Sequence, residues 1–401
     1  MKRITNRMIC MMLSVLAALA VFAGSFQVAK ADNYQLDLYL LSDYAYVYDI
    51  AHDAVLLDKN SSERMYPASL TKMMTEIIAL EHYTDMDRMI EITYPMIAGL
   101  KEAEASRIAY QVGDKASVRD LLYGVMLPSA ADSCHALAIT LDGSLSAFAD
   151  RMNRKAKEIG MKDTHFVNSS GLHDDDHYST CRDIATLMQY CIQNEQFLQI
   201  IQTYKYVTLP TTYDPEGCEI FNGVLRGFER RGYPAPGLVG GKTGFTDEAL
   251  QCLAVYAEIN DMKLIVVTAH GNGTSYNPAH FYDVSNILTE LEKWHYAKAL
   301  ETGEELKKIV IHHEYSDEET VIRSERGISQ VLPDEHVIRL ETGFADEYDS
   351  QLDDVEVTET VTLYCNDKVI DQWEQKVTIP KENSFFGRIV KFFRKLFSKN
   401  K

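Results

Sequence analysis

The residues of this sequence with the clearest chemical potential are a serine and a lysine three positions apart, Ser69 and Lys72. Residues three apart on a helix project from the same face, so the lysine amine can reach the serine hydroxyl. A serine hydroxyl is a poor nucleophile until a neighbouring base removes its proton. Lys72 can act as that base only when neutral, a state that burial beside a second cation would favour. The pair therefore predicts catalysis by an activated serine.

Two further short motifs follow in the chain. Ser129 is followed by two alanines, and Lys242-Thr243-Gly244 comes later. One or two Ser-x-x-Lys strings arise by chance in a chain of this length, and a second one begins at Ser398. The prediction therefore depends on the order and context of all three motifs.

The segments around these motifs predict helices between groups of strands. A turn at 51–53 between two β-rich runs predicts a hairpin. Pro67 opens a predicted helix whose apolar residues recur at helical spacing, so we expect it to bury one face. Further helices are predicted at 118–127, 132–159 and 184–202, and strands at 240–243, 252–258 and 264–269. This mixture predicts an α/β fold.

From about residue 303 the chain predicts a separate β-domain. Short β-branched runs between acidic or turn-forming residues occupy 308–312, 320–322, 336–340, 355–363 and 377–379. A mature chain of about 370 residues also exceeds one usual hydrophobic core. We therefore expect a catalytic domain at 32–300 and a small β-rich domain at 303–382.

The first 31 residues have the composition of a secretory leader. Three cations precede an apolar run from about Met8 to Ala23, and a small-x-small site ends at Ala31. We expect residues 1–31 to be a signal peptide that exports the protein and is cleaved after Ala31. An uncleaved anchor is the alternative, although the run is short for a membrane span.

The net charge and the cysteine content narrow the class of protein further. The formal net charge is −19, and removing the leader with its four cations leaves −23, which argues against nucleic-acid binding. Six cysteines remain after the leader, but their spacing selects no disulfide pairing and includes no Cys-x-x-Cys pair. We expect mainly buried free thiols.

The end of the chain, residues 383–401, is basic and amphipathic. Residues 385–401 carry six cations and no acid, interleaved with eight apolar side chains. On a helix these residues separate into an apolar stripe opposite the cations, the pattern of a helix lying among lipid headgroups. We expect a membrane-anchoring helix here. A packed terminal helix or a partner-binding helix is the alternative.

A family resemblance begins with Pro67-Ala68-Ser69-Leu70-Thr71-Lys72, which resembles the active-site helix of penicillin-binding proteins and class A β-lactamases. Residues 121–129 resemble the helix that leads to their second motif, and 240–246 resemble the third. Residues 152–183 contain Thr164-x-Phe166-x-Asn168 and Gly171-Leu172-His173, which resemble the low-molecular-mass D-alanyl-D-alanine carboxypeptidases of the peptidase S11 family. The resemblance covers roughly residues 34–298.

This resemblance implies a fold and a reaction. The fold would be the penicillin-binding protein/β-lactamase-like transpeptidase fold with a C-terminal all-β domain. Ser69 would attack the carbonyl between two terminal D-alanines, with Lys72 as general base, and water would hydrolyse the acyl-enzyme. The backbone N–H groups of Ser69 and Phe245 would form the oxyanion hole. Ser129 would relay a proton to the departing D-alanine.

The third motif would hold the substrate. Lys242 and Thr243 would bind its terminal carboxylate, and Gly244 would let the strand approach the ligand closely. One position departs from the family pattern, because the usual Ser-x-Asn is here completed by Ala131. The missing amide would cost on the order of 1 to 3 kcal/mol of substrate binding or acylation. Asp132 or a water could substitute for it.

Two other segments could carry chemistry of a different kind. His173-Asp174-Asp175-Asp176-His177 has metal-ligand chemistry, but it follows a family loop and no His-Glu-x-x-His is present. His135 lies six residues after Ser129, but the chain lacks the Gly-x-Ser-x-Gly elbow of a serine–histidine triad. We expect no metal and no cofactor.

The sequence therefore predicts a penicillin-sensitive serine D-Ala-D-Ala carboxypeptidase that trims peptidoglycan stem peptides. Its partners would be the stem peptide, β-lactam antibiotics and, through residues 385–401, a membrane surface. It would lie on the outer face of the cytoplasmic membrane or in the cell wall. The alternatives are a D,D-endopeptidase, a β-lactamase-like hydrolase, and a catalytically weakened cell-wall-binding scaffold, which Ala131 suggests.

Overall fold

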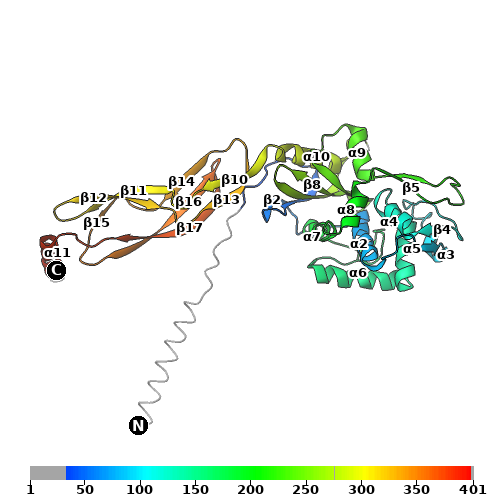
Figure 1. Cartoon of the computed structure of the whole chain (residues 1–401), viewed down its shortest axis with the longest axis horizontal. Coiled ribbons are helices and arrows are strands. Elements are labelled where there is room, and N and C mark those ends of the chain that lie inside the picture. The colour runs from blue at the N-terminus through cyan, green and yellow to red at the C-terminus, as the bar shows by residue number, and fades with distance from the viewer. Residues whose placement is uncertain (1–32, 275, 399–401) are drawn as a thin grey trace, which may run out of the picture. The chain divides into compact units, whose positions relative to one another are not determined.

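The computed structural model describes residues 33–274 and 276–398. They form two compact units, one of Asn33–Ala299 with Ser329–His336 and one of Leu300–Ile328 with the residues from Val337 onward (Figure 1). The predicted signal peptide lies outside the described residues. Residues 329–336, which we expected in the β-rich domain, belong to the first unit instead.

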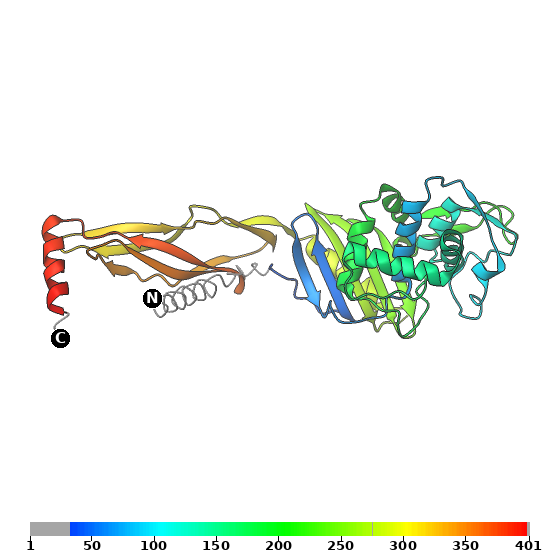
Figure 2. The same cartoon turned by 90° about the horizontal axis from the view of Figure 1, so that it is seen from below.

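The first unit is built on a five-stranded antiparallel sheet with the strand order β2-β1-β9-β8-β7. Its strands are β1 (Ser42–Asp49), β2 (Ala54–Lys59), β7 (Leu238–Thr246), β8 (Leu250–Ile259) and β9 (Met262–Gly271). Figure 2 shows the blue pair β1 and β2 beside the three later strands. The expected hairpin and the three expected strands are confirmed, and the pairing of β1 with β9 joins them into one sheet.

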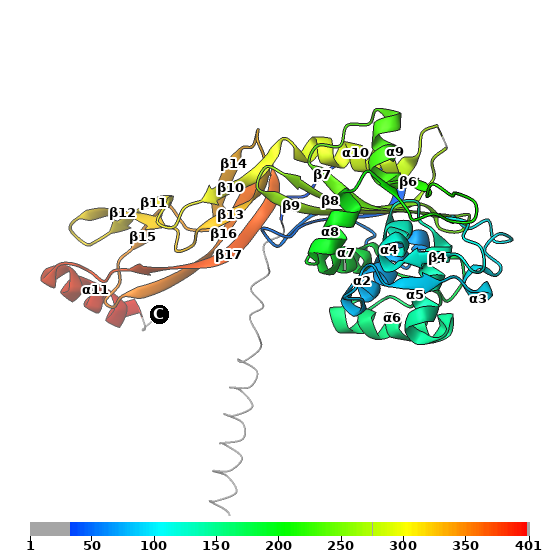
Figure 3. The same ribbon diagram turned by 45° about the vertical axis from the view of Figure 1, so that its right-hand side comes forward.

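Helices cover both faces of this sheet. They are η1 (Ala68–Thr71), α2 (Lys72–His82), α3 (Tyr94–Ile97), α4 (Val118–Met126), α5 (Ala131–Asp142), α6 (Leu145–Ile159), α7 (Cys181–Cys191), α8 (Glu195–Gln202), α9 (Gly223–Arg231) and α10 (Ala279–Leu291). Figure 3 shows α9 and α10 on one side of the strands and α2 and α4–α8 on the other. Successive strand residues point to opposite faces. On β8, Ala254 and Tyr256 accordingly join the core under α2, whereas Leu253 and Val255 join the core under α10.

Two predicted helices are each divided in the structure. The helix expected at 132–159 ends at Gly143, which has a φ of 78°, and restarts after Ser144, whose hydroxyl accepts from the N–H of Ala147. The helix expected at 184–202 is interrupted before Asn194, whose side chain caps α8. Glycine in the left-handed region and a polar N-cap are the usual end and start of a helix, so local capping overrides the continuous apolar pattern.

Helix α2 is buried on all sides, contrary to the expected single buried face. Every residue from Lys72 to Leu80 is buried, including the ionisable Lys72 and Glu76. Other helices surround α2, so its polar residues lie in the core as well as its apolar ones. This placement removes Lys72 from water.

Three further sheets have two strands each. They pair β3 (Met89–Glu91) with β4 (Lys115–Ser117), β5 (Lys205–Val207) with β6 (Glu219–Phe221), and β10 (Trp294–Leu300) with β13 (Ile328–Pro333). The six cysteines of the described residues are free thiols, and five of them are buried.

None of the described helices has the length and apolarity needed to cross a membrane.

The second unit consists of two three-stranded sheets and a terminal helix. One sheet has the order β12-β11-β15 and the other β14-β16-β17. Their bounds are β11 (Glu305–His312), β12 (Asp317–Arg323), β14 (Ile338–Thr342), β15 (Glu347–Asp349), β16 (Val355–Cys365) and β17 (Lys368–Ile379). Helix α11 (Phe385–Ser398) follows β17.

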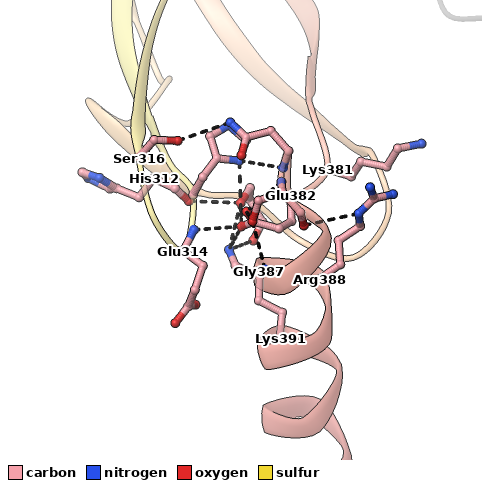
Figure 4. Close-up of polar contacts among 12 residues, drawn as sticks. His312, Glu314, Ser316, Lys381, Glu382, Gly387, Arg388 and Lys391 are labelled. Carbon is pink, nitrogen blue, oxygen red and sulfur yellow. Dashed lines mark hydrogen bonds and ion pairs between the residues drawn. The ribbon is translucent and has the colours of Figure 1, made fainter.

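Polar contacts fix the start of α11 to the sheets of its own unit (Figure 4). The buried Glu382 carboxylate accepts hydrogen bonds from the backbone N–H of Glu314, at 2.8 Å, and from the hydroxyls of Ser350 and Ser384, each at 3.1 Å. Lys391 lies 3.5 Å from the same carboxylate. Burial opposes ionisation of Glu382, but these hydrogen bonds outweigh it and lower its pKa to about 2. The helix is therefore held by an ionised, fully bonded carboxylate.

Candidate active site

Ser69 and Lys72 lie at the junction of η1 and α2. The Lys72 ammonium is 2.9 Å from the Ser69 hydroxyl and 2.5 Å from the carbonyl oxygen of Ser170. The Lys72 side chain is buried, and burial lowers its pKa, although Cys134 and Asp132 act in the opposite direction. A lysine with a lowered pKa is neutral at a lower pH than usual and can then accept a proton from the serine.

Ser129 lies in the turn between α4 and α5. Its φ is 65°, in the left-handed region that a non-glycine residue rarely adopts. The Ser129 hydroxyl accepts a hydrogen bond of 2.9 Å from the ammonium of Lys242 on β7. Strained backbone of this kind is concentrated at functional sites. The turn brings the second predicted motif into contact with the third.

Strand β7 carries the third motif past the start of η1. Lys242 is almost fully buried, and burial followed by the charge of Lys72 lowers its pKa well below the usual value. A Cβ added at Gly244 would lie 3.0 Å from the carbonyl oxygen of Pro67 and 3.2 Å from the backbone nitrogen of Ser69. Gly244 therefore permits close packing of β7 against η1. Thr243, Gly244 and the exposed Phe245 line the cleft together with Ser69.

The loop before α7 completes the surroundings of Lys72. Asn168 accepts hydrogen bonds from the backbone N–H groups of Ser170, at 3.1 Å, and Gly171, at 2.7 Å. Gly171 has a φ of 81°, and a Cβ there would lie 1.8 Å from the carbonyl oxygen of Ala68. Only glycine fits this position, which directs the Ser170 carbonyl toward Lys72. The sequence did not identify this carbonyl, because a backbone acceptor has no residue-type signal.

The two histidines of the candidate metal segment have different partners. His177 is buried, with Nδ1 accepting from the N–H of Val167 and Nε2 lying 2.7 Å from the Thr71 hydroxyl. His173 instead lines the cleft and lies 3.6 Å from Glu248. His177 therefore fixes the loop to η1. No group of three or more metal-ligating side chains occurs in the part of the chain that the structure describes.

The other histidine considered from the sequence, His135, does not contact the Ser129 hydroxyl. It is buried on α5, its Nδ1 has no hydrogen-bond partner within 33–274 and 276–398, and burial lowers its pKa to about 4. The hydroxyl of Ser129 contacts Lys242 instead. In this site each of the two serines therefore contacts a lysine: Ser69 contacts Lys72, and Ser129 contacts Lys242.

Ala131, which stands where the family pattern has an asparagine, borders the cleft. The neighbouring Asp132 carboxylate points elsewhere and accepts from the backbone N–H groups of Ile108, Ala109 and Tyr110. Asp132 therefore stabilises the 108–110 segment. It does not take the place of the missing asparagine.

The cleft around these residues has a volume of about 1030 Å³. Besides Ser69, Lys72 and Ser129, its lining includes Arg231 at the end of α9, which the sequence reasoning missed. The available signal was a cluster of arginines at 226, 230 and 231 in a chain of strongly negative charge.

Comparison with known proteins agrees with this geometry. A family model described as D-alanyl-D-alanine carboxypeptidase, peptidase S11, matches residues 36–273. The chain is 31% identical over 213 residues to the D-alanyl-D-alanine carboxypeptidase DacF of Bacillus subtilis, and the match covers 53% of each protein. The aligned part therefore spans about half the length of that relative.

Solved structures extend the comparison. The crystal structure of the Streptomyces K15 DD-transpeptidase matches with a TM-score of 0.55 and 27% identity, covering 63% of this chain and 98% of that one. Penicillin-binding protein 5 of Haemophilus influenzae matches with a TM-score of 0.59 and 22% identity, covering 86% and 98%. These likenesses confirm the predicted fold class. Because the family model covers more than half of the chain, the chain belongs to the peptidase S11 family of D-alanyl-D-alanine carboxypeptidases.

Proposed function

We propose that this protein removes the terminal D-alanine from peptidoglycan stem pentapeptides through an acyl-serine intermediate. The observation that carries the proposal is the 2.9 Å contact between the buried Lys72 amine and the Ser69 hydroxyl. A neutral Lys72 takes the hydroxyl proton as Ser69 attacks the carbonyl between the two D-alanines. The N–H groups of Ser69 and Phe245 stabilise the oxyanion that forms.

The second half of the reaction needs a proton donor and a water. As the tetrahedral intermediate collapses, the proton that Lys72 took from Ser69 passes through the Ser129 hydroxyl to the amine of the departing D-alanine, which leaves Lys72 neutral again. Water then attacks the acyl-serine with Lys72 again as base, which returns the Ser69 hydroxyl and releases the shortened peptide. The contact between Ser129 and the charged Lys242 supports this relay, because it holds the Ser129 hydroxyl in place.

The substrate itself would set the charges of the two lysines. Each buried ammonium disfavours the other, so the site holds one positive charge more easily than two. A substrate carboxylate bound between Lys242 and Thr243 would favour the charge on Lys242. Lys72 would then be neutral when the substrate is in place, which is the state that catalysis requires.

The experiment that tests this proposal is labelling with a penicillin, read by intact mass and peptide mapping. We expect one adduct per protein on Ser69, and none in Ser69→Ala. We also expect release of free D-alanine from a pentapeptide by the wild type only. A protein that folds normally but forms no adduct in the wild type would overturn the proposal and favour the weakened scaffold.

We infer further that the protein acts outside the cell, at a membrane surface. The support is the leader-like composition of residues 1–31 together with the surface of α11. Six apolar side chains of α11 are exposed: Phe385, Phe386, Ile389, Phe392, Phe393 and Leu396. Exposed apolar residues of this density on a basic helix suit the boundary between lipid headgroups and acyl chains. The Glu382 contacts (Figure 4) would hold that stripe in a fixed orientation on its own unit.

A further inference from the structure

A second cavity, of about 630 Å³, lies along helix α9. Its lining includes Arg226, Arg230 and Arg231, with Gly223 among them. Gly223 and Arg231 also line the catalytic cleft, so the two cavities adjoin. We call the surface formed by these four residues the α9 groove.

The groove begins beside the third catalytic motif. A Cβ added at Gly223 would lie 3.8 Å from the Thr243 hydroxyl oxygen, so α9 starts next to the proposed carboxylate site. A helix rises about 1.5 Å per residue, which puts Arg226 roughly 4.5 Å and Arg230 roughly 10 Å along the axis from Gly223. A ligand whose carboxylate contacts Thr243 can therefore continue into the groove with a short extension.

Two of the three arginines of the groove lie over aromatic rings. The guanidinium carbon of Arg226 lies 4.1 Å from the centre of the Phe221 ring, and that of Arg231 lies 4.8 Å from the Phe281 ring. Within the described residues, none of the three arginines forms an ion pair with a carboxylate. The one carboxylate of α9, Glu229, accepts from the Tyr204 hydroxyl instead, and the three cations outnumber it. An anionic ligand is therefore favoured at this place.

We propose that the α9 groove binds a carboxylate on the leaving-group side of a cross-linked stem peptide. The proposal rests on the carboxypeptidase function proposed above. In a cross-link, the D-alanine carbonyl is joined to an amine of a second stem, which carries carboxylates of its own. Ser69 would attack the same carbonyl, the amine of the second stem would leave with the relayed proton, and water would release the acyl group. The groove belongs to the same ligand because it continues the cleft past Thr243.

Three synthetic peptides test this directly. All contain diacetyl-L-Lys-D-Ala followed by a leaving residue: D-alanine, D-lysine with a succinyl group on its side chain, or D-lysine with the neutral succinamide in its place. The last two differ only in one carboxylate. The charge preference is the ratio of kcat/KM for the succinyl peptide to kcat/KM for the succinamide peptide.

We expect a charge preference of about fivefold in the wild type, the size of an exposed ion pair. Arg226→Gln with Arg230→Gln should reduce the preference to about one, while cleavage of the D-alanine peptide stays within twofold. The matched control removes two exposed charges of α6, Arg154→Gln with Lys157→Gln, and should keep the preference. Arg226→Lys with Arg230→Lys should restore part of it.

Equal rates for the two extended peptides in the wild type, or a preference that survives in the double glutamine variant, would overturn the proposal. The carboxypeptidase function fails separately, if the wild type does not cleave the D-alanine peptide. In that case calorimetric binding of the succinyl and succinamide peptides to the Ser69→Ala protein still tests the groove. Equal binding of the two peptides, or no binding of either, would overturn the proposed role of the α9 groove.

Discussion

The ammonium of Lys242 on β7 lies 2.9 Å from the hydroxyl of Ser129, in the turn before α5. The two residues are 113 positions apart in the chain, and each belongs to a different predicted motif. Their contact places the hydroxyl that we propose as the proton relay between a buried lysine and the cleft. Ser129 makes this contact from a left-handed backbone, with a φ of 65°.

The pH dependence of acylation reports on Lys72. Because burial lowers its pKa, the neutral base is available below the ordinary lysine value of 10.5. We expect the rate of penicillin acylation, measured from pH 4 to 11.5, to rise with pH and reach half its maximum below 10.5. Lys72→Arg keeps the charge but cannot act as a base, so the rate should fall about 10²- to 10⁴-fold. A midpoint at or above 10.5, or an unchanged rate in Lys72→Arg, would contradict the assignment.

A substitution at Gly171 tests whether its loop supports Lys72, the proposed general base. Gly171→Ala places a Cβ against the Ala68 carbonyl in a left-handed backbone, so we expect a loss of at least about 3 kcal/mol of stability and of penicillin labelling. Gly160 has a φ of 93° but open space around it, so Gly160→Ala should cost only about 1 kcal/mol and keep the labelling. Urea unfolding measures both. Similar losses in the two variants would show that the contact with Ala68 is unimportant.

Ala131 tests the departure from the family pattern. Ala131→Asn introduces the missing amide into the cleft, and we expect acylation about tenfold faster, the value of one added hydrogen bond. Ala131→Leu has nearly the same size without the amide and should not be faster. The measurement is the second-order rate of penicillin acylation. An equal gain in both variants would assign the effect to packing.

Glu76 should make the protein less stable at high pH. Its carboxyl group is fully buried without a hydrogen-bond partner in the described part of the chain, and burial raises its pKa well above the ordinary 4.5. A raised pKa in the folded state contributes stability that is complete below pH 4.5 and lost as pH rises through the folded value. We expect Glu76→Leu to be more stable than the wild type by about 1 to 3 kcal/mol at pH 8 and by less at pH 5.

Urea unfolding at the two pH values measures this difference. The exposed Glu102→Leu serves as the control and should show no change with pH. If the gain of Glu76→Leu were the same at both pH values, the carboxyl group would not be titrating between the folded and unfolded states. The effect would then come from packing alone.

The apolar stripe of α11 should carry membrane binding. We expect the mature protein to float with vesicles of phosphatidylcholine and phosphatidylglycerol, and the protein lacking residues 385–401 to remain in the dense fraction. Phe392→Ser with Phe393→Ser should release most of the protein from the vesicles. Tyr315→Ser removes an exposed aromatic of the same unit outside α11 and should not. Equal flotation of the truncated protein would rule out the anchor.

The sequence alone identified the motif residues, because three short motifs follow one another in an order and context that resemble a known family. Ser69 and Lys72 are also only three positions apart, so they meet locally, at the junction of η1 and α2. The hairpin and the strand runs were also predictable, since turn residues and β-branched runs act locally. The division of the helix at 132–159 was missed, because an apolar pattern continues across a capping glycine. The departure at Ala131 was visible in the sequence as well.

Tertiary structure decided what each of these residues touches. The burial of Lys72 and Lys242, which lowers their pKa values, depends on helices packed around α2 and on β7 passing η1. The carbonyl of Ser170 and the adjoining cavities along α9 likewise come from segments far apart in the chain. Desolvation and contacts between distant segments are properties of the packed molecule, so residue types and local spacing could name the candidate catalytic groups but not their environment.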